Sequence, residues 1–285
     1  MFFRRIVLNA LLVGIVAGFV LSLIQLLTIT PIIFAAEAFE VEKQHSHASD
    51  HSDIVRKEDE QASVAHIPAA STHKEHNNHH SESKNQAVEK EESWSPADGA
   101  ERTFYTFISN IFAAIGFSAL LLALMTQVQI SGVSQLSIIK GFAWGIAGFI
   151  ACFVAPGIGL PPEIPGIEAV AVEHRQVWWL LTAISVAAGL AVLVFAKLKF
   201  KILAPALMAI PYIMPIHHAQ GPSFSHPDLS VVEALTQLHQ QFIVAAAAGN
   251  FVFWLILGSC SAWAVKRFIL SEATLAAHGE LNANA

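Results

Sequence analysis

Long apolar stretches with few or no charged residues recur along the chain, and they constrain its fold more than any other feature. Six of them lie at about residues 6–34, 104–126, 141–160, 177–196, 198–216 and 242–265. A transmembrane helix needs about 20 mostly apolar residues, because the bilayer core is about 30 Å thick and each helical residue rises about 1.5 Å. The stretches therefore predict an all-α, polytopic helical membrane protein with about six transmembrane helices.

The fifth stretch is the weakest of the six. It carries Lys199 and Lys201 at one end and Pro205, Pro211 and Pro215 along its length. Proline removes a helical hydrogen bond and kinks or breaks a helix, so we expect this segment to be kinked, short or re-entrant. The membrane class itself agrees with the composition, since only 13% of the residues are charged, about half the fraction of ordinary soluble domains.

Basic residues indicate the orientation of the chain. With six spans and a cytoplasmic N-terminus, both termini are cytoplasmic and the short outer loops carry only Arg175. The inner side then receives Arg4, Arg5, Lys140, Lys197, Lys199, Lys201, Lys266 and Arg267. This asymmetry is the one that the positive-inside rule requires. Five spans without the fifth stretch would place Lys266 and Arg267 outside, which the rule disfavours.

The charged residues concentrate between the first two spans. Residues 37–102 hold 15 of the 22 acidic and 7 of the 16 basic residues. The segment is rich in Ser, Glu, Lys, Asn and His, a composition typical of disorder. We therefore divide the chain into a first transmembrane helix (1–36), an acidic, His-rich and mostly disordered periplasmic loop (37–102), a helical membrane domain with five further spans (103–267) and a cytoplasmic tail (268–285).

Histidines in this loop suggest metal capture. They form close pairs and triplets, and the candidate metal ligands are His45, His47, His51, His73, His76, His79 and His80. Neutral imidazole binds divalent transition metals, so we expect capture to weaken below about pH 6.5. The alternative interpretation is a solvated spacer. Which metal is bound does not follow, because the affinity of imidazole sites rises toward copper whatever the physiological cargo.

An outer mouth of the membrane domain would then take the ion. Its candidate ligands are Glu37, Glu40, His174, His217 and His218. Glu37 and Glu40 share one helical face, although they also fit a solvated helix end. Within the spans, the notable polar residues are Gln25, Thr28, Thr30, Asn110 and Asn250. These side chains fit either an ion pathway or hydrogen bonding between helices.

Several functions lack the residues that they need. No phosphate-binding P-loop, no His-Glu-x-x-His helix and no Gly-x-Ser-x-Gly elbow occurs in the sequence. No basic patch is present to bind nucleic acid, and Cys152 and Cys260 lie in apolar runs as packing residues. We therefore predict no enzymatic activity, no nucleic-acid partner and no cofactor other than a bound or transported divalent metal.

Particular motifs resemble those of a known family. The opening segment 3–40, the residues Trp94–Tyr105 and Asn110, the proline-rich run Ala155–Gly166, the residues Arg175–Trp179 and the last span around Phe242–Gly258 carry the resemblance. Together they are similar to the CbtA family of bacterial cobalt transporter subunits. The resemblance covers most of the chain apart from about residues 41–92 and the tail. The long His-rich insert departs from the family, and a five-span description is common for it.

The resemblance implies cobalt uptake linked to cobalamin synthesis, often beside a small single-span, His-bearing partner called CbtB. Together with the histidine pattern, it predicts the integral subunit of a cobalt or divalent-metal transporter. The implied setting is the bacterial inner membrane, with the lipid bilayer, divalent metal ions and a CbtB-like subunit as partners. The alternative is a non-transporting membrane protein that buffers or senses metal.

Overall fold

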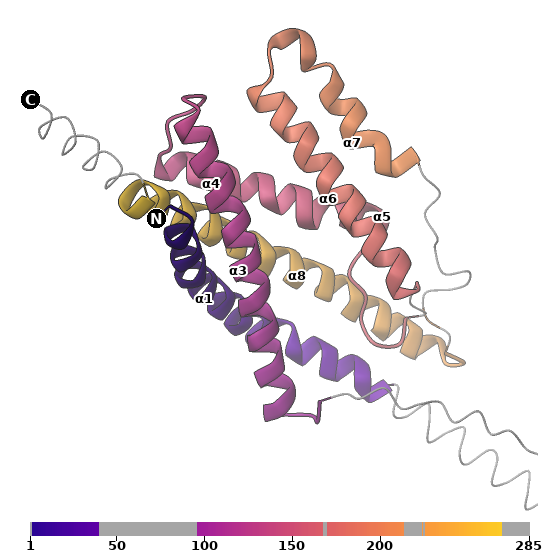
Figure 1. Cartoon of the computed structure of the whole chain (residues 1–285). Coiled ribbons are helices and arrows are strands. Elements are labelled where there is room, and N and C mark those ends of the chain that lie inside the picture. The colour runs from indigo at the N-terminus through magenta and orange to yellow at the C-terminus, as the bar shows by residue number, and fades with distance from the viewer. Residues whose placement is uncertain (1, 40–95, 168–169, 214–223, 225, 270–285) are drawn as a thin grey trace, which may run out of the picture.

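The structure is a computed structural model that describes residues 2–39, 96–167, 170–213, 224 and 226–269. Long helices pack side by side over these ranges (Figure 1). In chain order they are α1 (Phe2–Thr28), a short helix at Thr30–Phe39, α3 (Ala100–Ile130), α4 (Ile138–Phe149), η1 (Ile150–Val154), α5 (Ala155–Gly159), α6 (Val172–Phe195), η2 (Leu198–Phe200), α7 (Leu203–Ile213), α8 (Leu229–Ala264) and η3 (Val265–Ile269).

Five of the described helices are long and apolar enough to cross a membrane. They are Phe3–Thr28, Ala100–Ile130, Ile138–Gly159, Val172–Phe195 and Leu229–Ile269. The third of them joins α4, η1 and α5 without a break. The helical membrane class predicted from the sequence is thereby confirmed.

The fifth expected span, at about residues 198–216, is the one that differs. Over the described residues, which end here at Ile213, its helix α7 has 11 residues, and at about 1.5 Å per residue these are too few to cross a bilayer core of about 30 Å. Pro211 lies inside it. The described residues therefore contain five helices long enough to span a membrane, where about six were expected. The stretch that does not form one is 198–216, which was the weakest of the six.

Although α7 is short, it still carries the chain back along α6. Near its start, Ala204 and Met208 pack against Gly189 of α6. Near its end, the Tyr212 hydroxyl donates a hydrogen bond to the Ala155 carbonyl, at 2.6 Å. The chain accordingly returns to the end of the bundle where α8 begins. The two chain ends of the bundle meet at the opposite side, where α1 contacts η3 (Figure 1).

Glycines set the closest helix contacts. A Cβ at Gly14 would lie 2.5 Å from Ile115 Cα, and one at Gly18 would lie 2.6 Å from Ile111 Cα, so α1 and α3 touch backbone to backbone. Gly141 approaches Gly258 in the same way where α4 crosses α8. Small residues permit such contact between helices in lipid.

Charge divides the bundle into two ends. One end carries the acidic residues of the described ranges, namely Glu37, Asp98, Glu101, Glu163, Glu173, Asp228 and Glu233. Its two basic residues, Arg102 and Arg175, are each ion-paired with an acid. The opposite end carries Arg4, Arg5, Lys140, Lys197, Lys199, Lys201, Lys266 and Arg267. We call these the acidic end and the basic end below.

Candidate functional site

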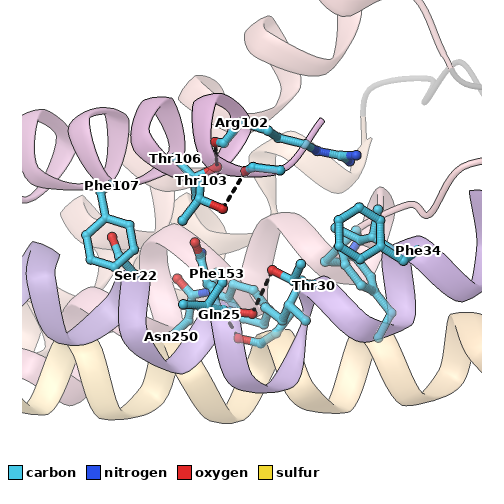
Figure 2. Close-up of a pocket in the computed structure, with 17 residues that line it drawn as sticks. Ser22, Gln25, Thr30, Phe34, Arg102, Thr103, Thr106, Phe107, Phe153 and Asn250 are labelled. Carbon is cyan, nitrogen blue, oxygen red and sulfur yellow. Dashed lines mark hydrogen bonds between the residues drawn. The ribbon is translucent and has the colours of Figure 1, made fainter. Parts of the chain in front are cut away.

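A cavity of about 320 Å³ lies toward the acidic end, between α1, the short helix, α3 and α8 (Figure 2). Its apolar lining includes Phe34, Phe107, Phe153 and Phe242. Its polar lining consists of Ser22, Gln25, Thr30, Arg102, Thr103, Thr106 and Asn250. Apart from Arg102, these polar groups are neutral hydroxyls and amides, which offer oxygen atoms to a passing solute.

The polar side chains of α1 and α3 meet across the helix interface. Asn110 donates hydrogen bonds from Nδ2 to Gln25 Oε1, at 2.6 Å, and to Ser22 Oγ, at 3.1 Å. Thr30 donates to the Gln25 carbonyl at 3.3 Å. Hydrogen bonding between helices is therefore confirmed for Gln25 and Asn110. Gln25 also lines the cavity, and the ion-pathway interpretation stays a prediction. Thr28 neither joins the helices nor lines the cavity, since its hydroxyl bonds the Ile24 carbonyl of its own helix.

An ion pair stands at the mouth of the cavity. Arg102 of α3 binds the Glu37 carboxylate through two nitrogen atoms, at 2.6 and 3.1 Å, and also reaches Asp98 at 3.2 Å. The Arg102 guanidinium lies over the Phe34 ring, 5.4 Å from its centroid. Arg102 and Glu37 are 33% and 29% exposed, so the pair is partly shielded from water. It neutralises the charge of the only acidic group of the short helix that the structure describes.

This ion pair lies between residues that flank the histidines of the His-rich segment. Glu37 precedes the first of these histidines, His45, and Asp98 follows the last, His80. Because Arg102 binds both carboxylates, these two flanking residues are held together. Arg102 and Gly99 also line the cavity.

Most of the predicted metal ligands fall outside the described ranges. These are Glu40, His45, His47, His51, His73, His76, His79, His80, His217 and His218. Of the two that are described, Glu37 pairs with Arg102, and His174 is exposed in the first turn of α6. Within the described ranges, no three His, Cys, Asp or Glu side chains are grouped closely enough to hold a metal ion. The predicted ligand set therefore stays a prediction.

The third span ends in a second polar arrangement. Pro156 has no N–H, so it leaves the Cys152 carbonyl without its helical partner. The Trp179 indole donates a hydrogen bond to that carbonyl at 2.9 Å, and Trp178 donates to the Pro156 carbonyl at 3.0 Å. Tyr212 binds the Ala155 carbonyl. Three aromatic donors thus attach the hairpin of α6 and α7 to the end of the third span around Pro156.

The loop after the third span contributes one residue, Pro162, to the cavity lining. His239 of α8 binds the Pro162 carbonyl at 2.9 Å, and Pro162 lines the cavity. Asp228 caps α8 by accepting a hydrogen bond from the Ser230 N–H at 2.8 Å, and this bond lowers the pKa of the Asp228 carboxyl. Asp228 and His239 together hold the start of α8 and the loop in place.

Several lining residues were not identified from the sequence. Ser22, Arg102, Thr103, Thr106 and Pro162 all belong to the cavity. The spacing of polar residues could have identified some of them, because Arg102, Thr106 and Asn110 are four residues apart and therefore share one face of α3. Ser22 likewise precedes Gln25 by three. The spacing of residues along one helix does not show which other helix packs against this polar face.

Comparison with known proteins gives one result. The model of the family described as "Probable cobalt transporter subunit (CbtA)" matches residues 3–266. The matched range includes every residue of the cavity and all five long helices up to Lys266. No curated protein and no solved structure matches the chain.

Proposed function

Because the chain belongs to the CbtA family of probable cobalt transporter subunits, we propose that it is the integral membrane subunit of an uptake system for cobalt or a related divalent metal. In this proposal it lies in the bacterial inner membrane. Its basic end faces the cytoplasm, as the positive-inside rule favours. A small single-span, His-bearing subunit of the CbtB type is the proposed partner.

The observation that supports the proposal is the pairing of the residues that flank the His-rich segment. Arg102, which lines the cavity, binds both Glu37 before the segment and Asp98 after it. Tethering raises the effective concentration of a bound ligand near its anchor. A metal ion held by imidazoles of this segment would accordingly be concentrated beside the cavity.

The cavity provides the next step of the proposed route. An ion released at the mouth meets Thr103, Thr106 and Thr30, and then Gln25 and Asn250 deeper in the bundle. Hydroxyl and amide oxygens can replace part of the water shell of a divalent ion, but they bind it weakly compared with carboxylate or imidazole. Weak ligands suit passage, since an ion that binds tightly in a pathway does not leave it.

Glu37 has a specific role in this route. A divalent ion that approaches the mouth competes with the Arg102 guanidinium for the Glu37 carboxylate. Displacement of Arg102 would open the mouth and hand the ion to the cavity. The Arg102–Glu37 pair is therefore proposed to keep the mouth closed until metal arrives.

Radioactive cobalt uptake tests the proposal. Cells that lack their own importer would express the full chain with and without a CbtB-like subunit, beside a variant deleted for residues 43–92. We expect uptake with the full chain, and a deficit in the deletion variant that appears at low cobalt and disappears at high cobalt. Absence of uptake in every combination, with the protein shown to be inserted, would reject transport and favour a metal buffer or sensor.

A further inference from the structure

The connection between α6 and α7 alternates basic and apolar residues. Its sequence is Lys197-Leu198-Lys199-Phe200-Lys201-Ile202-Leu203, and its first part forms the 3₁₀ turn η2. The span Val172–Phe195 ends directly before it. The connection therefore lies at the level where the bilayer changes from acyl chains to headgroups.

The three lysines are open to a partner. Lys197 and Lys199 are exposed and Lys201 is half-buried. Within the described ranges none of the three has an ion pair or a hydrogen bond from its ammonium group, and Lys199 lies over the Phe200 ring, 5.0 Å from its centroid. This differs from Lys140 at the same end, which donates hydrogen bonds to Ser134 and to the Gln135 carbonyl.

The apolar residues of the connection are equally uncovered. Leu198 is 84% exposed and Ile202 is 79% exposed, and Phe200 and Leu203 are also exposed. The α6–α7 hairpin stands at the edge of the bundle, where it rests on η1 and α5 (Figure 1). Side chains of this kind beside the end of a transmembrane helix contact acyl chains, while adjacent lysines extend to the headgroup level.

The electrostatic surroundings favour an anion. The basic end carries eight Lys and Arg residues in the described ranges and no described acid. All seven described acids lie at the acidic end. Nothing in the described ranges therefore competes for the three lysines from within the protein.

We propose that residues 197–203 form a binding site for an anionic phospholipid. Lys197, Lys199 and Lys201 hold the headgroup phosphate, and Leu198 and Ile202 contact its acyl chains. Lysines near a membrane surface attract anionic lipid. The site does not depend on the proposed metal transport, because it lies at the other end of the bundle.

Native mass spectrometry of the full-length protein tests the site. The protein would be released from nanodiscs that contain equal amounts of phosphatidylglycerol and phosphatidylcholine, and the retained lipids would be counted. The variant Lys197→Gln/Lys199→Gln/Lys201→Gln is expected to lose about tenfold in retained phosphatidylglycerol relative to phosphatidylcholine. The variant in which the same lysines are replaced by arginine is expected to retain the lipid as the parent does.

A charge-matched control separates the site from the overall charge. The variant Lys74→Gln/Lys84→Gln/Lys90→Gln removes the same three charges from the His-rich segment, and it is expected to retain phosphatidylglycerol normally. Equal phosphatidylglycerol retention by the parent and the variant with Gln at positions 197, 199 and 201 would overturn the proposal. Equal losses in that Gln variant and in the control would overturn it as well. If the triple variant does not insert, each single substitution to Gln is expected to reduce retention about twofold, and no reduction in any of them would also overturn it.

Discussion

Arg102 of α3 binds both carboxylate oxygens of Glu37, at 2.6 and 3.1 Å, and so joins two residues that are 65 positions apart in the chain. Between them lies the His-rich segment that suggests metal capture. The ion pair thus connects the part of the chain with the most candidate ligands to the part that crosses the membrane.

The first prediction concerns this pair. Glu37→Gln and Arg102→Gln are each expected to lower the free energy of unfolding by about 1 kcal/mol, because each leaves a partly shielded charge without its partner. The double variant should cost less than the sum of the two, which a double-mutant cycle by thermal unfolding in detergent measures. Asp98→Asn serves as the control, since Asp98 is 82% exposed and should contribute less than about 0.5 kcal/mol. Strict additivity of Glu37→Gln and Arg102→Gln would show that the pair does not stabilise the fold.

The second prediction concerns the α1–α3 contact. A Cβ at Gly18 would lie 2.6 Å from Ile111 Cα, whereas one at Gly116 of α3 meets nothing within 4 Å. Gly18→Ala is therefore expected to destabilise the protein by about 1–3 kcal/mol through overpacking. Gly116→Ala is expected to be neutral or to stabilise α3 by up to about 1 kcal/mol through helix propensity. Equal unfolding temperatures for the two variants would contradict the close approach of α1 and α3.

The third prediction concerns the end of the third span around Pro156. Trp179→Phe removes the indole donor to the Cys152 carbonyl and is expected to cost about 1 kcal/mol. In the Pro156→Ala background, residue 156 regains an N–H that can bind the Cys152 carbonyl, so Trp179→Phe should cost less there. Thermal unfolding of the four proteins measures the difference. An unchanged cost in the Pro156→Ala background would mean that the indole does not compensate for the proline.

The fourth prediction concerns the cavity as a route. Ala246 of α8 is buried and lines the cavity, and Ala248 is exposed and does not line it. Ala246→Leu adds three carbon atoms to the cavity and is expected to reduce cobalt uptake about tenfold or more. A tenfold reduction corresponds to a loss of about 1.4 kcal/mol in the binding of the ion in the pathway. Ala248→Leu is expected to leave uptake unchanged. Both variants would be compared at equal amounts of inserted protein, and unaffected uptake by Ala246→Leu would exclude this cavity from the route.

The fifth prediction concerns pH. Imidazole binds metal only when neutral, and its ordinary pKa is about 6.5. Protonation therefore competes with metal, so binding is complete above this pKa and is lost as the pH falls through it. Cobalt retained by the purified protein at pH 7.5 and pH 5 measures the effect, with the variant deleted for residues 43–92 as the control. Equal retention by the full chain at both pH values would argue against capture by histidine.

The helical membrane class could be predicted from the sequence because apolar length is a local property. The stretches at 6–34, 104–126 and 242–265 needed no partner to be recognised, since a bilayer imposes the same requirement on each helix separately. The fifth stretch was less certain for an equally local reason, as Pro205, Pro211 and Pro215 interrupt it. Over the described part of this stretch, the structure gives it a helix of 11 residues, Leu203–Ile213.

The cavity could not be predicted in the same way, because it depends on which helix faces meet. Gln25, Thr30 and Asn250 were recognised as polar residues within spans, but Arg102 and Ser22 were not linked to them. The link arises only when α1 packs on α3 through Gly14 and Gly18 and places these side chains opposite each other.

The sequence by itself determined that the chain is a helical membrane protein with a His-rich segment between its first two spans, because apolar length, charge asymmetry and composition are properties of neighbouring residues. Only the tertiary structure decided that Arg102 pairs with Glu37 and Asp98, which flank the histidines of this segment, and that Arg102 lines a cavity. The reason is physical: an ion pair across 65 residues depends on helix packing, and packing is set by the shapes of distant side chains and glycines together.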